Sequence, residues 1–492
     1  MKNITTTTIL IFLLLATTNI TNAQWSLIGN DIDGETTGDN SGVSVCLSSD
    51  GNTVAIGAFY NDGNGTNSGH VRIHNYSGGI WTQKGGDIDG EDSFDRSGIS
   101  VSLSSDGNTV AIGAGDNDGN GTSAGHVRIY RYSSGIWTQM GSDIDGEAAD
   151  DYSGVPVCLS SDGNIVAIGA STNYGSGLHS GHARIYYYSG GIWTQMGNDI
   201  DGEGASDQSG WSLSLSDDGS IVAIGAIMNN GNGLASGHVR IYNYSGGAWS
   251  QIGDDINGEA SNDQSGYSVS LSSDGNTVAI GAIGNDGNGN YAGHVRIYNY
   301  SGGVWSQLGA DIDGESADNY FGNSVSLSSD GNIVAIGAPG NDSNGSMSGH
   351  VRIYNYSVGA WLQQGNDIEG ENPNDYSGFV VDLNSDGSMV AIGAYYNDGN
   401  GIDAGHVRVY NYASGIKENT ANTKITIYPN PTTGKIRIEA EGIEKIEAIN
   451  LIGKTIYTGN EKEIDLRKEP KGIYFIKVIT NKQTISKKII KE

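Results

Sequence analysis

The sequence predicts an all-β protein, a seven-bladed β-propeller followed by a small immunoglobulin-like β-sandwich. Three observations predict this class: tryptophans that recur every 56 residues, four short strand patterns within each interval, and a change of charge near residue 417. With 492 residues and a formal charge of −30, the chain is long enough for two domains. We expect a signal peptide at 1–23, the propeller at 24–416, a linker at 417–424 and the second domain at 425–492.

The first 23 residues have the pattern of a signal peptide. Lys2 gives the positive start, an apolar run follows from Ile9 to Ala16, and small residues precede a cleavage position after Ala23. The apolar run is shorter than the roughly 20 residues that a membrane-spanning helix needs. We therefore expect export without a transmembrane segment.

The repeats carry the strongest signal in the sequence. Each repeat contains four runs rich in β-branched and aromatic residues, separated by Gly, Asn and Asp turn signals. Four strands per repeat of this length are typical of a propeller blade. The last repeat stops after its third strand at Tyr412, so we expect the N-terminal strand to complete that blade and close the ring. The repeating tryptophans are Trp25, Trp81, Trp137, Trp193, Trp249, Trp305 and Trp361.

Charge and cysteine content exclude several functions. Residues 1–416 hold 11 Lys and Arg against 46 Asp and Glu, a net charge of −35, whereas residues 417–492 carry a net charge of +5. An acidic surface of this size repels nucleic acid and favours cations and basic partners, so nucleic-acid binding is excluded. Cys46 and Cys158 occupy the same position in two non-adjacent repeats, which predicts small buried residues rather than a disulfide.

The sixth repeat contains Phe321-Gly322 and then Gly337-Ala338-Pro339, and with this pair it resembles the FG-GAP repeat of integrin α-chain propellers. The resemblance implies calcium bound between the first and second strands of a blade by alternating acidic residues and a closing aspartate. Only the seventh repeat approaches that pattern, with Asp382, Asn384 and Asp386. Its closing position is Val390, so this hairpin is explained more simply as an Asp-Gly turn.

A second candidate for calcium is the acidic segment that follows each tryptophan strand. Acidic residues at positions one, three, five and nine have the spacing of a calcium loop, although the glycine follows the second acid. The alternative is a set of solvated acidic turns. The predicted Ca²⁺ ligands are Asp31, Asp33, Glu35, Asp39, Asp87, Asp89, Glu91, Asp95, Asp143, Asp145, Glu147 and Asp151.

Two positions vary between repeats and carry aromatic residues in some of them. They are the first residue of the inner strand and the pair after the second strand, which we expect at the acidic end of the ring near the channel mouth. Aromatic side chains there are suited to stack on a sugar or to anchor a protein loop, and neutral drift is the alternative. The predicted ligand-binding residues are Trp211, Tyr267, Phe379, Phe59, Tyr60, Tyr395 and Tyr396.

One His and one Arg also recur in every repeat, as in His126 and Arg128. A sevenfold repetition indicates packing between blades, where Arg pairs with neighbouring carboxylates. A catalytic site needs residues that break the repeat, and the sequence contains no evident Ser-His-Asp set. We therefore expect a protein that is not an enzyme.

The last 68 residues are rich in Lys and in short alternating strands. Their ordered motifs resemble the C-terminal sorting domain of type IX secretion cargo, with an ordinary accessory β-domain as the alternative. The resemblance implies a Bacteroidetes-type Gram-negative source, recognition of residues 425–492 by the outer-membrane translocon, and delivery outside the cell or to its surface. The residues that carry it are Tyr428, Pro429, Asn430, Pro431, Gly434, Gly472 and Tyr474.

Together these patterns favour an exported, non-enzymatic adhesion or binding protein whose ligand is a glycan or an extracellular protein, with calcium as a candidate cofactor. An exported hydrolase and a structural surface-layer protein are the alternatives. The hydrolase predicts polar residues unique to one or two blades, whereas the surface-layer protein predicts uniform polar blade ends.

Overall fold

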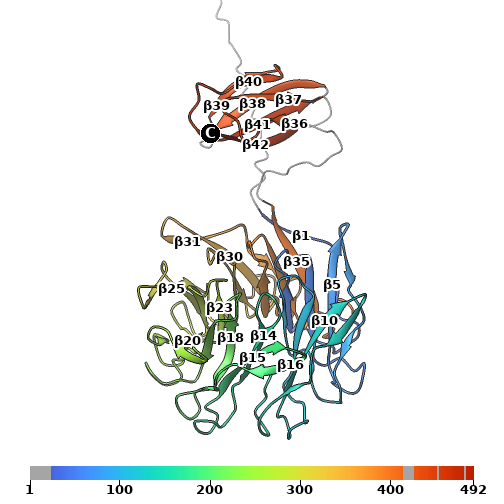
Figure 1. The fold of residues 1–492 in the computed structure, drawn as a ribbon, viewed down its shortest axis with the longest axis vertical. Helices are drawn as coiled ribbons and strands as arrows, with labels where there is room; N and C mark the ends of the chain where they lie inside the picture. The colour runs from blue at the N-terminus through green and yellow to red at the C-terminus, as the bar shows by residue number, and fades with distance from the viewer. Residues whose placement is uncertain (1–23, 414–425, 441, 451–453, 481–483) are drawn as a thin grey trace, which may run out of the picture. The chain divides into compact units, whose positions relative to one another are not determined.

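A computed structural model describes residues 24–413, 426–440, 442–450, 454–480 and 484–492 (Figure 1). Residues Trp25–Tyr412 form one compact unit and the C-terminal residues belong to another. Every regular element in these residues is a β-strand, which confirms the all-β class, and none of them forms a helix of the kind that spans a membrane. The predicted signal peptide, its cleavage position after Ala23 and the linker at 417–424 lie outside the described residues.

The first unit consists of seven antiparallel sheets with the same strand order, which we number as blades 1 to 7 along the chain. In blade 1 the order is β3 (Ser44–Leu47), β4 (Thr53–Ala58), β5 (His70–Ser77) and β6 (Ile80–Gln83). A fifth strand, β7 (Ile88–Asp89), pairs with the start of β5. The sequence predicted four strands; the fifth forms because the side chain of Ile88 is buried, which returns the acidic segment to β5.

The corresponding strands of the other blades have closely similar lengths. The first strands are β8 (Ser100–Leu103), β13 (Val157–Leu159), β18 (Ser209–Leu215), β23 (Ser268–Leu271), β28 (Ser324–Leu327) and β33 (Val380–Leu383). The second strands are β9 (Thr109–Ala114), β14 (Ile165–Ala170), β19 (Ile221–Ala226), β24 (Thr277–Ala282), β29 (Ile333–Ala338) and β34 (Met389–Ala394). The third strands are β10 (His126–Ser133), β15 (His182–Ser189), β20 (His238–Ser245), β25 (His294–Ser301), β30 (His350–Ser357) and β35 (His406–Ala413).

The outer edge of each blade is a longer strand followed by a two-residue strand. The longer ones are β11 (Ile136–Gln139), β16 (Ile192–Gln195), β21 (Ala248–Gln251), β26 (Val304–Gln307), β31 (Ala360–Gln363) and, in blade 7, β1 (Gln24–Leu27). The short ones are β12 (Ile144–Asp145), β17 (Ile200–Asp201), β22 (Ile256–Asn257), β27 (Ile312–Asp313), β32 (Ile368–Glu369) and, in blade 7, β2 (Ile32–Asp33).

The two ends of the propeller chain meet in blade 7. There β1 and β2 pair with β35, and Figure 1 shows β1 beside β35. The first strands of neighbouring blades also contact one another in cyclic order, from β3 through β33 and back to β3. Because the ring is closed, the first strand of every blade has a neighbouring blade on both sides.

The core lies in the seams, by which we mean the boundaries between neighbouring blades. In β4, Val54 and Ile56 pack against blade 7 while Ala55 packs against blade 2, and all three are buried. Both faces of such a strand are covered, which explains why the second strands are apolar without alternation. Small residues on one face and branched residues on the other let adjacent blades approach closely.

The C-terminal unit contains two sheets around one core. One consists of β36 (Thr426–Tyr428), β37 (Lys435–Glu439) and β40 (Glu463–Asp465). The other consists of β39 (Thr455–Gly459), β38 (Ile443–Asn450), β41 (Gly472–Thr480) and β42 (Thr484–Lys491). Ile438, Ile446 and Ile476 are fully buried between them, as a β-sandwich requires; its immunoglobulin-like topology stays a prediction.

Candidate functional site

The strand registers bring three segments of every repeat to one end of the ring. In blade 1, Ala58 at the end of β4 pairs with His70 at the start of β5, and Ser44 at the start of β3 pairs with Gly57. Asp89 on β7 pairs with His70 as well. The acidic segment, the β4–β5 connection and the residues before β3 therefore share this end, which we call the acidic end.

The four acidic residues of one segment have different roles. In the second segment, Asp87 accepts a hydrogen bond from the side chain of Gln83 at 2.5 Å, and Asp89 lies exposed on β7. Asp95 is buried and accepts hydrogen bonds from the side chain of Asn117 and from the backbone amide of residue 92, both at 3.0 Å. The fourth acid is thus fixed inside the loop as a turn-forming group.

The first and third segments repeat this division, since Asp39 and Asp151 are also buried and accept a backbone amide three residues earlier. The acids of one segment therefore do not converge on a single point, as a calcium loop would require. Calcium binding by the twelve predicted ligands stays a prediction. They are Asp31, Asp33, Glu35, Asp39, Asp87, Asp89, Glu91, Asp95, Asp143, Asp145, Glu147 and Asp151.

Each seam instead gathers residues of two blades: the third acid of one segment, the histidine that begins the next third strand, and the first acid of the next segment. We call these three residues a seam group. In the group of Glu147, His182 and Asp199, the histidine Nδ1 lies 3.9 Å from the glutamate Oε2 and 4.0 Å from the aspartate Oδ2. Equivalent groups are Glu35, His70 and Asp87; Glu91, His126 and Asp143; Glu203, His238 and Asp255; and Glu371, His406 and Asp31.

The recurring arginine lies beside the seam group. Arg184 donates to the carbonyl of Asp145 at 2.7 Å, lies 3.6 Å from the Oε1 of Glu147, and covers the ring of Tyr186. Burial and this guanidinium lower the pKa of His182 to about 4, so its imidazole is neutral at neutral pH. The predicted pairing of the repeated arginine with neighbouring carboxylates agrees with these contacts.

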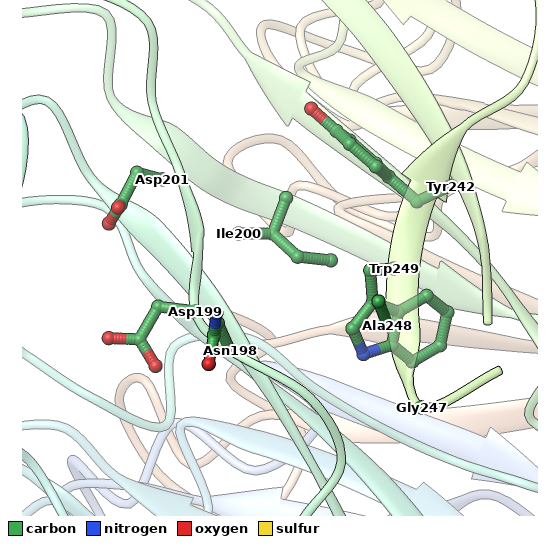
Figure 2. A pocket seen from close by; sticks show the side chains of 8 residues that line it. All are labelled: Asn198, Asp199, Ile200, Asp201, Tyr242, Gly247, Ala248 and Trp249. Atoms are coloured by element: carbon green, nitrogen blue, oxygen red, sulfur yellow. The ribbon is translucent and has the colours of Figure 1, made fainter. Parts of the chain in front are cut away.

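A groove with an aromatic wall lies on the outer side of the seams. Figure 2 shows one between blades 3 and 4, with Tyr242 and Trp249 on one side and the segment Asn198, Asp199, Ile200 and Asp201 on the other; its volume is about 310 Å³. The indole of Trp249 donates to the carbonyl of Met196 at 2.7 Å, so the tryptophan also joins the two blades. The same positions line a groove between blades 7 and 1.

Aromatic residues at the acidic end form a cluster that does not repeat. The ring centroid of Tyr395 lies 4.5 Å from the centroid of Phe379, 4.1 Å from that of Tyr396 and 6.0 Å from that of Tyr376. Burial and three neighbouring tyrosines, among them Tyr267, raise the pKa of Tyr395. We call the four rings of Tyr376, Phe379, Tyr395 and Tyr396 the aromatic cluster.

The other predicted ligand-binding residues extend or lie apart from this cluster. Trp211 packs against Tyr267 with ring centroids 5.6 Å apart, and Tyr267 is one of the tyrosines that raise the pKa of Tyr395. Phe59 and Tyr60 stack on each other at 3.9 Å in blade 1. Their role as ligand contacts stays a prediction.

Sequence reasoning missed two further variable positions at this end. Both hold residues other than glycine at φ between 47° and 56°, in the left-handed region. One carries Tyr320 and Tyr376, and the other carries Tyr291, whose ring lies 5.7 Å from that of Tyr320. No residue type marks these positions in the sequence, because Asn, Arg, Gln, Tyr, Ser, His, Ala, Met and Asp all occur there.

The C-terminal motif residues have structural roles in the second unit. The side chain of Asn430 accepts the amide of Ile490 at 2.8 Å and donates to the carbonyl of Lys488 at 2.9 Å, which ties the Tyr428–Pro431 segment to β42. Tyr474 is buried and donates to the carbonyl of Pro470 at 2.6 Å. Gly434 has a left-handed φ of 142°, where an added Cβ would meet Arg467.

Comparison with protein families gives two matches at the places the motifs indicate. Residues 426–492 match the secretion system C-terminal sorting domain, and residues 257–298 and 310–354 match the FG-GAP repeat. The chain carries FG-GAP repeats and a type IX sorting domain. It is therefore exported by type IX secretion and is a secreted or cell-surface protein of a Bacteroidetes-type bacterium.

Solved structures resemble this chain distantly. The β-propeller domain of Cps50 (Swd1) from Myceliophteria thermophila is 11% identical, with 79% of this chain and 99% of that chain covered at a TM-score of 0.47. The periplasmic gluconolactonase PpgL of Pseudomonas aeruginosa is 14% identical, with 67% and 86% covered at a TM-score of 0.45. Curated protein sequences give no significant match. At these values the similarities carry no information about activity.

The FG-GAP motif serves close packing between the inner strands. Phe321 is fully buried, and the amide of Gly322 donates to the carbonyl of Gly337 at 3.1 Å. A Cβ on Gly337 would lie 1.9 Å from the carbonyl oxygen of Gly378 in the next blade, so only glycine permits this approach. The looser versions with serine in the phenylalanine position keep the glycines.

The position where FG-GAP repeats hold calcium has other partners in blade 7. Asp382 accepts the amide of Leu47 at 2.7 Å and the hydroxyl of Ser326 at 3.0 Å, while Asn384 accepts the amide of Met389. Burial raises the pKa of Asp382 to about 6. Asp382 thus takes the place of the serine or cysteine that accepts the next blade's leucine amide elsewhere, as Cys46 does for Leu103.

Proposed function

We propose that this exported propeller is a non-enzymatic carbohydrate-binding protein, and that its glycan docks on the aromatic cluster of Tyr376, Phe379, Tyr395 and Tyr396. The observation that carries the proposal is that this cluster breaks the sevenfold repeat at one end of the ring. Sugar rings stack on aromatic faces while tyrosine hydroxyls exchange hydrogen bonds with sugar hydroxyls. Tyr396 is 37% exposed, so its ring is accessible to a ligand.

Backbone strain supports a ligand-binding role for the tyrosines. Tyr376, Tyr320 and Tyr291 all have left-handed φ values, which cost on the order of 1 kcal/mol in a residue other than glycine. Glycine or asparagine would remove most of this cost. Large side chains at these positions are consistent with a gain outside the fold itself.

The net charge defines the class of glycan. The propeller residues up to 416 carry a net charge of −35, and the aromatic cluster lies at the end that holds the acidic segments. Anionic polysaccharides are repelled by such a field. The proposed ligand is therefore a neutral polysaccharide.

The non-enzymatic part of the proposal is supported by the pattern of titratable groups. Histidine and carboxylates meet in seam groups that recur around the ring, whereas one active site requires groups that differ from their counterparts. In the aromatic cluster the side chains are tyrosine and phenylalanine, which supply stacking rather than acid–base chemistry.

Affinity electrophoresis of the purified chain through gels with neutral soluble polysaccharides, galactomannan and mixed-linkage β-glucan, tests the proposal. A symmetrised variant with Phe379→Val, Tyr395→Ile and Tyr396→Gly imports residues that other blades carry at these positions. The matched control is Tyr187→Asn, because Tyr187 is 41% exposed on β15 and five other blades carry Asn there.

We expect retardation of the wild type and of Tyr187→Asn, and loss of retardation in the symmetrised variant, with alginate gels retarding none of them. Retardation that survives in the symmetrised variant would place the ligand elsewhere. Failure of all neutral polysaccharides to retard the wild type would contradict the carbohydrate assignment. Release of reducing sugar from either polysaccharide by the wild type alone would show that the protein is an enzyme.

A further inference from the structure

We propose that five of the seven seams are binding sites for a divalent transition-metal ion of the zinc type, each formed by one histidine and two carboxylates from two adjacent blades. The proposal is independent of the aromatic cluster and of carbohydrate binding. It also differs from calcium binding by the acids of one segment, because the ligands come from both sides of a seam.

The geometry of the seam of His182 is the starting point. Its Nδ1 faces Glu147 and Asp199 at 3.9 and 4.0 Å, which is too long for a hydrogen bond. A metal ion about 2.1 Å from each of two ligands separates those ligands by about 3.4–4.2 Å. Both distances from Nδ1 therefore fit an ion between the histidine and each carboxylate.

In the seam of His182, the buried histidine has an unsatisfied nitrogen directed at this place. The side chain of His182 is 1% exposed, and its Nδ1 has no hydrogen-bond partner among the described residues. The low pKa of its ring keeps the imidazole neutral, so Nδ1 presents either a lone pair to two carboxylates or a proton without an acceptor in reach. A bound cation resolves both arrangements.

The carboxylates of the seam are also incompletely neutralised. Arg184 lies beside the Oε1 of Glu147, which leaves Oε2 facing the histidine. Burial and the charge of Asp199 raise the pKa of Asp201 on the same segment. Glu147, Asp199 and Asp201 together with Arg184 leave two negative charges, which one divalent ion balances.

Two seams show that this place takes a cation. The guanidinium of Arg352 forms ion pairs with both Glu315 and Asp367. Arg408 likewise lies 3.3 Å from Asp31 and 3.3 Å from Glu371. In these two seams the arginine bridges the two carboxylates itself. In the groups of His70, His126, His182 and His238, and in the seam where His294 lies 3.9 Å from Glu259, each ion pair of the arginine is with the glutamate alone.

Space and ligand type define the ion. The seam of Glu91, His126 and Asp143 opens into a cavity of about 450 Å³ that Asn117 and Asp145 also line, which leaves room for metal-bound water. One imidazole nitrogen with two carboxylate oxygens suits zinc and its neighbours, whereas calcium prefers six to eight oxygen ligands. We therefore expect zinc rather than calcium.

Native mass spectrometry of the complete chain, first stripped with EDTA and then equilibrated with zinc in the micromolar range, counts the ions. We expect a species with five zinc ions, one for each seam without a bridging arginine. His182→Gln and Asp199→Asn should each reduce the number by one. Asp199→Asn also serves where His182→Gln fails to fold, because Asp199 is 31% exposed and its replacement keeps the side-chain shape.

Two controls come from the chain itself. His350→Gln removes the imidazole from a seam in which Arg352 bridges the carboxylates. His74→Tyr gives blade 1 the tyrosine that the six other blades carry at this position. Both variants should still bind five zinc ions. Anomalous diffraction at the zinc edge should then show the ions at the five seams. The proposal would be overturned if no zinc binds, or if calcium binds in place of zinc. It would also be overturned if His182→Gln and Asp199→Asn leave the number of bound zinc ions unchanged, or if His350→Gln loses as many ions as they do.

Discussion

The seam groups and the aromatic cluster lie at the same end of the ring. The seam groups follow the sevenfold repeat, whereas the aromatic cluster departs from it. The seam groups repeat one histidine and two carboxylates beside one arginine, and in three seams this arginine lies 3.5–3.6 Å from the glutamate. The aromatic cluster uses rings that blade 7 carries and most other blades lack. The repeated residues hold the blades together, and we propose that the unrepeated residues meet a ligand. A variant tests this difference when it removes a repeated residue or gives an unrepeated position the residue that other blades carry.

The largest effect is expected from a seam tryptophan. Trp193→Ala removes a ring that packs on Tyr188 and an indole that donates to the carbonyl of Met140 at 2.7 Å. The free energy of unfolding should fall by about 3–4 kcal/mol, measured by chemical denaturation. Trp211→Val, which gives the unrepeated tryptophan the residue of blades 1 and 3, is the control and should cost less than about 1 kcal/mol. Equal losses would contradict the distinction.

Asp382→Ser should raise the free energy of unfolding of the propeller in a pH-dependent way. Burial raises the pKa of Asp382 from 3.8 to about 6, so the folded state binds its proton more tightly than the unfolded state does. The aspartate therefore destabilises the fold above pH 6, by about 2–3 kcal/mol, and the penalty disappears as pH falls below 4.

The serine keeps a hydroxyl acceptor for the amide of Leu47, as Ser102 does for Leu159. Denaturation at about pH 8 should thus show the variant as more stable, and denaturation at about pH 3 should show almost no difference. A gain that is the same at both pH values would mean that the charge of Asp382 is not the cause.

Tyr376→Asn tests the cost of a large residue in the left-handed region. Asn40 occupies the same position in the first repeat and asparagine tolerates this conformation well. Affinity for the neutral polysaccharide should fall about fivefold, which corresponds to about 1 kcal/mol, while stability stays the same or rises by a few tenths of a kcal/mol. Calorimetric titration and thermal unfolding measure the two effects, and a variant with lower stability and full affinity would reverse the assignment.

The smallest effect is expected from His74→Tyr. The six other blades have tyrosine there, and in five of them a guanidinium lies 5.4–5.7 Å from the ring centroid. Burial lowers the pKa of His74 to about 4, and its Nδ1 has no hydrogen-bond partner in the part of the chain that the structure describes. The variant should be about 0.5–1 kcal/mol more stable in denaturant, because Arg72 gains an aromatic face.

The sequence predicted the fold better than the site for a physical reason. Spacing between tryptophans and turn glycines is a property of consecutive residues, so the strand order and the pairing of β1 with β35 followed from it. The short strand β7 was missed because two residues give no periodicity, and only the burial of Ile88 reveals it. The acids of one segment were expected to act together; the structure instead groups Glu147 with His182 and Asp199, which lie 35 and 52 residues further along the chain. Residues that meet across a seam are far apart along the chain, so their contact leaves no local pattern in the sequence.

Pairing in blade 7 also determines how the ring responds to tension. β35 is the last strand of the propeller, and it has β34 on one side and β1 and β2 on the other. A pull on the chain from its C-terminal side therefore acts along the axis of a strand that is hydrogen-bonded on both edges. Such a load is shared by many hydrogen bonds in parallel rather than opening them one after another. The strand arrangement that closes the ring thus also suits a protein that is held by its C-terminal side under load.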